Sequence, residues 1–228
     1  DVALLARTPE ALREAADDLR ERSGRRVLAV PADTGEDEAV RVAVEGVINE
    51  LGGVDIIVNA AAYAATRRPL HDDDLEGEIN VKVRGYLRCV RAVAPSMADR
   101  GWGRIINVSG IAARQTGSIT GSIRNVAVAA MTKNLADELG PKGINVTVVH
   151  PGMTITEQSP ERFAALAETR GGDAASIAAD LAARVSLGRL VHADEVASVI
   201  AFLASPLSVA LNGDAIIASG GVRGAIYY

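Results

Sequence analysis

The fold of this chain is decided by residues 103–152, which read GRIINVSGIAARQTGSITGSIRNVAVAAMTKNLADELGPKGINVTVVHPG. The segment opens with an apolar run of strand length, Ile105–Ser109, and closes with a second one, Ile144–His150. Between them, Ser122–Leu139 carries helix-forming residues, and Gly140-Pro141 ends that helix. A strand, a helix and a second strand in this order predict a parallel βαβ unit.

The rest of the chain repeats this alternation of short apolar runs and longer amphipathic segments. Runs that are apolar on both faces are typical of parallel strands buried between helices. No internal repeat or linker interrupts the pattern, so we predict one α/β domain over residues 1–228 with a doubly wound parallel sheet. The other predicted strands are Val2–Ala6, Val27–Pro31, Val54–Asn59 and Asp214–Ala218, the other helices are Glu10–Arg22, Asp37–Leu51, Leu75–Arg100 and Asp194–Ala204, and residues 153–187 are expected to be mostly helical.

The composition excludes several classes of function. The net charge of −5 argues against a nucleic-acid-binding protein, because phosphate binding needs a clustered positive field. No run of 18 apolar residues is present, so we expect no membrane span and no membrane partner. The three histidines are too scattered for a metal site. The single cysteine, Cys89, excludes an intrachain disulfide and fits a reducing cytoplasm, which is the expected location.

Polar or small residues follow the predicted strands at the points where each strand ends. In an open parallel sheet, ligands bind in the crevice beyond the carboxyl ends of the strands. Small residues there let a flat ligand approach the backbone closely. The residues that this rule selects are Arg7, Asp33, Thr34, Asn59, Ala60, Ala61, Ser109, Gly110, Pro151 and Gly152.

Several motifs resemble those of the short-chain dehydrogenase/reductase family. The resemblance lies in DIIVNAAA, INVKVRGYLRCV, GRIINVS, AVAAMTKNLADELGPKGINVTVVHPG, HPGMTIT and GRLVHADEVASVIAFLAS, and it covers essentially the whole chain. It implies a Rossmann-type sheet in three layers, α/β/α, and hydride transfer between a nicotinamide coenzyme and a small carbonyl or alcohol substrate. It also implies a homodimer or homotetramer formed through the two long helices.

The resemblance assigns roles to particular residues. Asn80 is similar to the active-site asparagine of the family, and Ser109 lies beside the usual position of the catalytic serine, which Gly110 occupies. Asp33 resembles the residue that contacts the adenine, and Thr156 the threonine that contacts the nicotinamide amide. The remaining residues expected to bind the coenzyme are Arg7, Thr34, Asn59, Ala60, Ala61, Asn125, Pro151 and Gly152.

The end of the first predicted strand bears on the choice of coenzyme. NAD-preferring members of the family often place an aspartate where this chain has Ala6. Arg7 follows, and a guanidinium there can pair with a 2′-phosphate. Arg7 therefore slightly favours NADP(H) over NAD(H), the alternative being a solvated arginine at a strand end.

The usual catalytic pair of the family, a tyrosine and a lysine one helical turn apart, is replaced by Gly121 and Asn125. Three readings stay open: an oxidoreductase with a rewired site, a catalytically silent protein that binds a nucleotide or a partner, and a non-redox enzyme. Arg124 is either a binding site for an anion or a surface or interface arginine, and His150 is either a titrating group or a packed strand end. The Gly-rich loop that binds pyrophosphate in this family is expected ahead of Asp1.

Overall fold

The computed structural model describes residues 1–62 and 72–223, which alternate between strands and helices as predicted. Most of the expected boundaries are met within a few residues. The strands are β1 (Val2–Ala6), β2 (Val27–Pro31), β3 (Ile56–Asn59), β4 (Gly103–Val108), β5 (Ile144–Pro151), β6 (Thr154–Ile155), β7 (Val191–His192) and β8 (Ala215–Ala218). The helices are α1 (Pro9–Ser23), α2 (Asp37–Leu51), α3 (Asp72–Glu78), α4 (Gly85–Arg100), α5 (Ile119–Leu139), α6 (Ser159–Arg170), α7 (Ala174–Ala182) and α8 (Ala193–Ala204).

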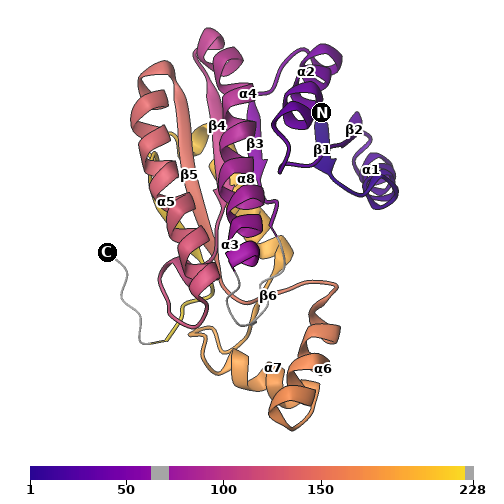
Figure 1. Ribbon diagram of the computed structural model, residues 1–228, viewed down its shortest axis with the longest axis vertical. Helices are drawn as coiled ribbons and strands as arrows, with labels where there is room; N and C mark the ends of the chain where they lie inside the picture. The colour runs from indigo at the N-terminus through magenta and orange to yellow at the C-terminus, as the bar shows by residue number, and fades with distance from the viewer. Residues whose placement is uncertain (63–71, 224–228) are drawn as a thin grey trace.

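The centre of the molecule is a parallel sheet in the order β3-β4-β5-β8. Helices α4 and α5 lie on one face of this sheet and α8 lies on the other (Figure 1). This arrangement confirms the predicted three-layer α/β/α fold of the Rossmann type. The segment after β5, with α6 and α7, extends beyond the carboxyl ends of the strands (Figure 1).

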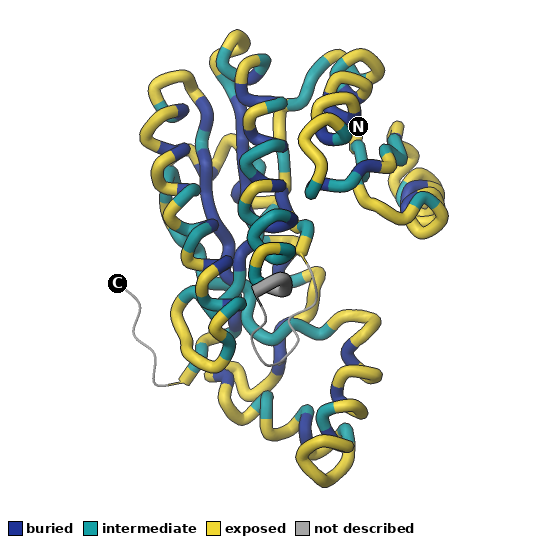
Figure 2. The backbone as a smooth tube through the Cα atoms, viewed as in Figure 1, coloured by how far each residue is buried: buried dark blue, intermediate teal, exposed yellow. Residues whose placement is uncertain are grey.

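The two central strands are buried on both faces, as Figure 2 shows for β4 and β5. Successive side chains of a strand point to opposite faces. Ile105 accordingly packs with the cluster that includes α2, α4 and α5, whereas Ile106 packs with the cluster that includes α8. Both isoleucines are fully buried, at 0% exposure. The apolar run of β4 is therefore explained by burial on two sides, and it fixes the register of the sheet.

The strands at the start of the chain form a separate ribbon. β1 pairs in parallel with β2, from Val2 opposite Val27 to Ala6 opposite Pro31. Within the described residues β1 does not pair with β3, so each of them is an edge strand. Ile56 and Val58 of β3 are each 42% exposed, unlike the residues of β4. The parallel strands of the described residues therefore fall into two groups.

Two helices show details beyond their predicted bounds. The break that the sequence allows near the start of the predicted helix Leu75–Arg100 is a π-helical turn, Ile79–Arg84, between α3 and α4. α5 begins at Ile119 rather than at Ser122, because the side chain of Ser118 caps it. Turns of π-helix inside longer helices occur frequently at functional sites, so the Ile79–Arg84 turn calls for close inspection.

Candidate active site

The carboxyl ends of three neighbouring strands bring three buried polar residues to one edge of the sheet. Ser109 directly follows β4, His150 is the penultimate residue of β5, and Ser219 follows β8. They are 8%, 0% and 3% exposed, respectively. Within the described chain, the Ser219 hydroxyl has no hydrogen-bond partner, whereas the His150 ring interacts with the backbone of Gly110. Since buried polar groups are normally paired, the Ser219 hydroxyl suits this edge to a polar ligand.

Lys82 reaches the same edge from the π-helical turn. Its Nζ donates a hydrogen bond of 2.9 Å to the backbone carbonyl of Ser109, and the residue is only 3% exposed. The pKa of Lys82 is lowered to about 7, mainly by burial and also by the positive charge of Arg124, while Glu78 opposes both effects. A buried amine that changes its charge near neutral pH, at the carboxyl edge of a parallel sheet, is a candidate functional group.

Arg124 and Glu78 form an ion pair beside Lys82. Their side chains are 7% and 12% exposed, and they join the first turns of α5 to the end of α3. The reading of Arg124 as a surface arginine is therefore wrong, because the side chain is buried. Glu78 compensates much of the guanidinium charge, which limits how strongly Arg124 alone attracts an anion.

Asn125 of α5 lies beside Ser109, at the carboxyl end of β4. The Ser109 hydroxyl donates a hydrogen bond of 3.0 Å to the backbone carbonyl of Asn125. The Asn125 side chain lies against Gly110, where an added Cβ would be 3.0 Å from its Nδ2. Its Oδ1 is buried without a partner among the described residues. Two residues that the sequence predicted for the site are thus neighbours, and the amide of Asn125 is left with an unused acceptor.

Gly121 lies in the first turn of α5, under the cap of that helix. The Ser118 hydroxyl oxygen accepts a hydrogen bond of 3.0 Å from the Gly121 N–H. A Cβ at Gly121 would lie only 2.8 Å from that oxygen. A larger side chain at position 121 would therefore displace the cap that starts α5.

His150 contributes a neutral imidazole to the edge. Burial lowers its pKa to about 4, and the positive charges of Arg114 and Lys82 act in the same direction. The sequence offered His150 as a packed strand end or as a titrating group. In the structure His150 is fully buried and also lies within electrostatic reach of Lys82. At neutral pH the ring is uncharged and can donate or accept a hydrogen bond.

Asn80, the other predicted catalytic residue, contacts the loop after β2 instead. Its Nδ2 donates to the Gly35 carbonyl at 3.2 Å, and its Oδ1 accepts from Arg88 at 2.9 Å. Asn80 and Lys82 are two positions apart on one helical turn, so their side chains point in different directions. The structure brings Lys82, rather than Asn80, into contact with Ser109.

The predicted coenzyme residues after β2 shape a turn. The Asp33 carboxylate accepts a hydrogen bond of 2.7 Å from the Gly35 N–H, as aspartates in tight turns commonly do. Thr34 is 8% exposed, and its hydroxyl donates to the Val81 carbonyl at 3.4 Å. This contact ties the β2 loop to the π-helical turn, next to Lys82 in the sequence.

The predicted residues after β3 combine a buried amide with small side chains. The Asn59 Nδ2 donates to Asn107 Oδ1 at 2.9 Å, and the Asn107 Nδ2 donates to Thr132 at 2.9 Å. This chain of buried hydrogen bonds links β3, β4 and α5, which gives Asn59 a structural role. Ala60 is exposed and Ala61 is partly buried directly after it.

The remaining predicted residues lie at the other strand ends. Arg7 follows β1 and is exposed. Gly152 follows β5, and a Cβ there would meet Ser219 at 2.9 Å, so β5 and β8 end in close contact. The backbone N–H of Thr156 donates to the Ser159 hydroxyl at 2.8 Å, which leaves the exposed Thr156 side chain for other contacts. Pro151, the last residue of β5, precedes this turn.

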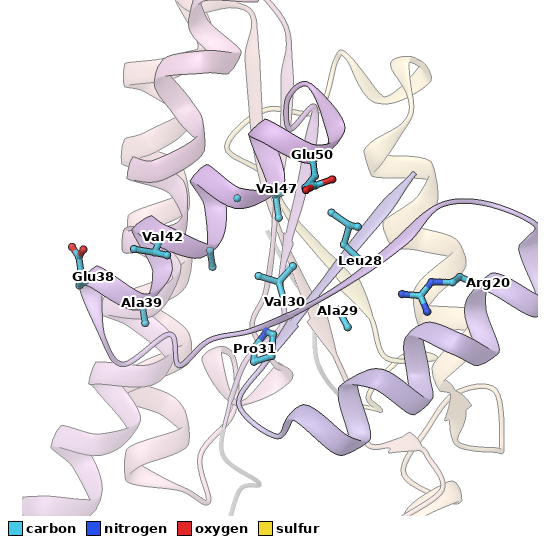
Figure 3. Close-up of a pocket in the computed structure, with 12 residues that line it drawn as sticks. Arg20, Leu28, Ala29, Val30, Pro31, Glu38, Ala39, Val42, Val47 and Glu50 are labelled. Carbon is cyan, nitrogen blue, oxygen red and sulfur yellow. The ribbon is translucent and has the colours of Figure 1, made fainter.

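A hollow of about 910 Å³ lies elsewhere, between β2 and α2 (Figure 3). Apolar residues such as Leu28 and Val47 line it together with the charged residues Arg20, Glu38 and Glu50. None of the residues at the carboxyl ends of β4 and β5 takes part in this hollow. Its lining lacks the buried polar atoms found at the ends of β4, β5 and β8, and we take that edge of the sheet as the candidate site.

Lys82 is the site residue that sequence reasoning missed. Its signal was a lysine between Val81 and Val83, in a helix whose neighbouring positions are apolar. A long cationic side chain usually lies with its charged end in water, so the pattern alone indicates a solvated residue. Only the π-helical turn turns Lys82 toward Ser109.

Two features are absent from residues 1–62 and 72–223. No helix in that part of the chain is both long enough and apolar enough to cross a membrane. No group of three or more histidine, cysteine, aspartate or glutamate side chains is placed to hold a metal ion there.

Comparison with known proteins identifies the family. The family model described as enoyl-(acyl carrier protein) reductase matches residues 1–223. The chain is 35% identical over 202 residues to the short-chain reductase protein NovJ of Streptomyces niveus, an alignment that covers 87% of this chain and 76% of NovJ. The chain therefore belongs to the short-chain dehydrogenase/reductase family.

Solved structures show the same fold. L-sorbose reductase from Gluconobacter frateurii, complexed with NADPH and L-sorbose, superimposes with a TM-score of 0.91 at 29% identity, covering 98% of this chain and 87% of that one. An NAD+-bound xylitol dehydrogenase gives a TM-score of 0.87 at 25% identity, covering 96% and 88%. An NADPH-bound short-chain oxidoreductase from Pseudomonas aeruginosa PAO1, described as containing an atypical catalytic center, gives 0.86 at 31% identity, covering 98% and 87%.

Proposed function

We propose that this protein is an NAD(P)(H)-dependent oxidoreductase that interconverts a small carbonyl compound and its alcohol. The observation that carries the proposal is the group of buried polar residues at the carboxyl ends of β4, β5 and β8, where Lys82, Ser109, Asn125 and His150 lie. Relatives that reduce or oxidise sugars and polyols, such as L-sorbose reductase and xylitol dehydrogenase, support the same reaction class.

The residues at this edge fit a dinucleotide in two respects. Asn125 Oδ1 and the Ser219 hydroxyl are buried polar atoms without partners in the described chain, and they are available to a polar ligand. Ala60 and Ala61 present little side-chain bulk where the ligand would pass. In this proposal the coenzyme is held by Arg7, Asp33, Thr34, Asn59, Ala60, Ala61, Asn125, Pro151, Gly152 and Thr156.

The coenzyme supplies or accepts the hydride when it is bound. The protein must orient the carbonyl carbon, supply a proton to the carbonyl oxygen and exclude water from the reacting atoms. Ser109 and Asn125 lie where the substrate would meet the coenzyme, and α6 and α7 extend beyond that point (Figure 1). These two helices are suited to cover the substrate, since they follow directly from the end of β5.

A second candidate function is a catalytically silent protein that binds a nucleotide or a partner. The observation that favours it is Gly121, which carries no proton-donating side chain and where an added Cβ would lie 2.8 Å from the Ser118 hydroxyl oxygen that caps α5. The two candidates differ in turnover and agree on nucleotide binding, so one experiment separates them.

The test is fluorescence of the reduced nicotinamide on addition of the protein, followed by assays over a panel of ketones, ketoses and quinones. We expect enhanced fluorescence with NADPH and NADH, and turnover with at least one carbonyl compound. Binding without turnover on the whole panel would favour the silent candidate. Binding of neither coenzyme would contradict the proposal.

Arg7 supplies a prediction about coenzyme choice. If its guanidinium pairs with the 2′-phosphate, Arg7→Ala should weaken NADPH binding by about tenfold to a hundredfold and leave NADH binding within about twofold, since a charge-assisted pair contributes about 1.5–3 kcal/mol. Titration of both coenzymes by fluorescence measures the ratio. Arg13→Ala, on the exposed face of α1, is the control. An equal loss for both coenzymes would contradict the preference for NADP(H).

The proposal also covers the oligomeric state of the protein and its location in the cell. Ile119, Ile123 and Val126 form a stripe on α5 and are 63%, 42% and 51% exposed. Such a stripe is typical of a helix that packs against another copy, which supports a homodimer or homotetramer. Cys89 is buried, and burial raises the pKa of its thiol to about 11, so it stays unreactive in the reducing cytoplasm where we place the protein.

A further inference from the structure

Resting on the proposed oxidoreductase function, we infer that the Lys82 ammonium is the proton donor to the substrate oxygen during carbonyl reduction. The inference assigns to Lys82 the proton donation that the resemblance implies for a tyrosine, which α5 does not contain. It starts from the position of Nζ, 2.9 Å from the Ser109 carbonyl at the carboxyl end of β4. No other lysine lies near this edge, because Lys133 and Lys142 are exposed residues of α5 and the turn that follows it.

The geometry suits proton delivery. An ammonium carries three donors, and the Ser109 carbonyl uses one of them, which leaves two for a substrate oxygen or a bridging water. The π-helical turn fixes the backbone from which Lys82 extends, and Thr34 holds the adjacent Val81 carbonyl at 3.4 Å. A donor that is held on a rigid element needs little reorganisation when the reaction occurs.

The charged groups around Lys82 come from each neighbouring element. Arg124 on α5 favours the neutral amine, and Glu78 on α3 favours the ammonium. His150 on β5 is also in electrostatic reach, and it is uncharged at neutral pH because its own pKa is lowered to about 4. The balance leaves Lys82 able to gain and lose a proton near pH 7, which is the property that a general acid–base group needs.

The step balances as written for reduction. A hydride reaches the carbonyl carbon, the carbon–oxygen π bond breaks, and the oxygen takes a proton from Lys82 Nζ. The carbonyl compound is reduced, the coenzyme is oxidised, and Lys82 becomes a neutral amine. A proton from solvent restores the ammonium before the next turnover. In the reverse direction the neutral amine accepts the proton of the alcohol.

The first test measures the proton on Lys82 directly, without catalysis. The chain has three lysines, so protein labelled with 13C at lysine Cε gives three resolvable signals in a proton–carbon spectrum. Lys82→Arg identifies the Lys82 signal by its loss. We expect this signal to titrate near pH 7 and the other two near pH 10.4. A Lys82 signal that titrates near 10 would overturn the inference even if the protein proves to be an active oxidoreductase.

The second test separates proton donation from a purely electrostatic role. Lys82→Arg keeps the charge and the donor to Ser109, but arginine does not release a proton near neutral pH. We expect Lys82→Arg and Lys82→Gln each to lower kcat by about 100-fold or more, with coenzyme affinity within about threefold of wild type. The fall of the wild-type reduction rate above pH 7 should vanish in the residual activity of both variants. Lys133→Gln should retain wild-type rates.

The outcomes distinguish this inference from the function on which it rests. If the Lys82→Gln variant retained the activity of the wild-type protein, the inference would be overturned and the oxidoreductase proposal would stand. Activity that survives only in Lys82→Arg would also overturn it, because the charge alone would then suffice. Failure of the wild-type protein to bind NADPH and NADH would overturn the proposed function, and the inference with it. Far-UV circular dichroism of each variant shows whether a loss reflects unfolding.

Discussion

Replacing Lys82 with methionine should stabilise the folded protein at pH 6 and slightly destabilise it at pH 9.5. The ordinary pKa of a lysine is 10.5, and the value for Lys82 in the fold is about 7. At about 1.4 kcal/mol for each pKa unit, the buried charge destabilises the fold by about 4–5 kcal/mol at pH 6. Loss of the hydrogen bond to Ser109 offsets about 1–3 kcal/mol of the gain, so the net stabilisation at pH 6 is about 2 kcal/mol.

The direction of the pH dependence follows from proton uptake. Between pH 7 and pH 10.5 the unfolded chain binds a proton at Lys82 that the folded chain does not hold, so wild-type stability rises with pH across this window. Below pH 7 both states are protonated and the destabilisation is constant. The difference in unfolding free energy between Lys82→Met and wild type should therefore shrink by about 3 kcal/mol from pH 6 to pH 9.5.

Urea unfolding at the two pH values measures this difference. Lys133→Met is the matched control, because Lys133 is exposed and pairs with Asp137 on the surface of α5 at 2.6 Å. It should change stability by less than about 0.5 kcal/mol at either pH. If the effect of Lys82→Met did not depend on pH, burial of the charged Lys82 amine would not lower the free energy of unfolding. The proposed active site would then not reduce the stability of the fold.

Gly143→Ala should destabilise the protein by at least about 3 kcal/mol, because the backbone of another turn fills the space beside it. Gly143 precedes β5 with a φ of +80°, and an added Cβ would lie 2.0 Å from the Gly101 carbonyl oxygen. That carbonyl belongs to the backbone and cannot rotate away as a side chain does. The alanine must therefore push apart the turns that start β4 and β5, whose pairing begins at Gly103 and Ile144.

Gly24→Ala provides the control for backbone conformation alone. Gly24 ends α1 with a φ of +63°, and nothing lies within 4 Å of an added Cβ. Its loss should be only about 1–2 kcal/mol, the strain of a left-handed alanine. Chemical denaturation of the two variants gives the comparison. Equal losses would show that the contact with Gly101 relaxes, and that the starts of β4 and β5 are not held rigidly.

The strand and helix pattern was predictable because it is local. The apolar runs at Ile105 and Ile144 and the glycines after the helices predicted the βαβ order, and the structure confirms it. The edge that carries the site was predictable too, since the carboxyl ends of parallel strands meet at one side of a sheet. Ser109 was selected on this basis and Asn125 through the resemblance, and the two residues are hydrogen-bonded neighbours.

The direction in which side chains point was not predictable where a helix departs from regular geometry. A regular helix over Leu75–Arg100 gives no reason to place the Lys82 amine beside Ser109, and the resemblance selected Asn80 as the catalytic residue of this helix. The π-helical turn rotates this segment, so that Lys82 contacts Ser109 while Asn80 contacts Gly35. Hydrogen bonds to distant residues select that turn, and sequence spacing does not record them.

The sequence by itself determined the family, the order of elements and the edge of the sheet at which we propose the active site. It also determined that Gly121 and Asn125 stand where the family carries its tyrosine and lysine. Only the tertiary structure decided that Lys82 lies at that edge and how readily its amine loses a proton. The pKa of Lys82 depends on burial and on Arg124 and Glu78, which come from helices some forty positions apart. Long-range packing sets the local dielectric, and no local pattern encodes it.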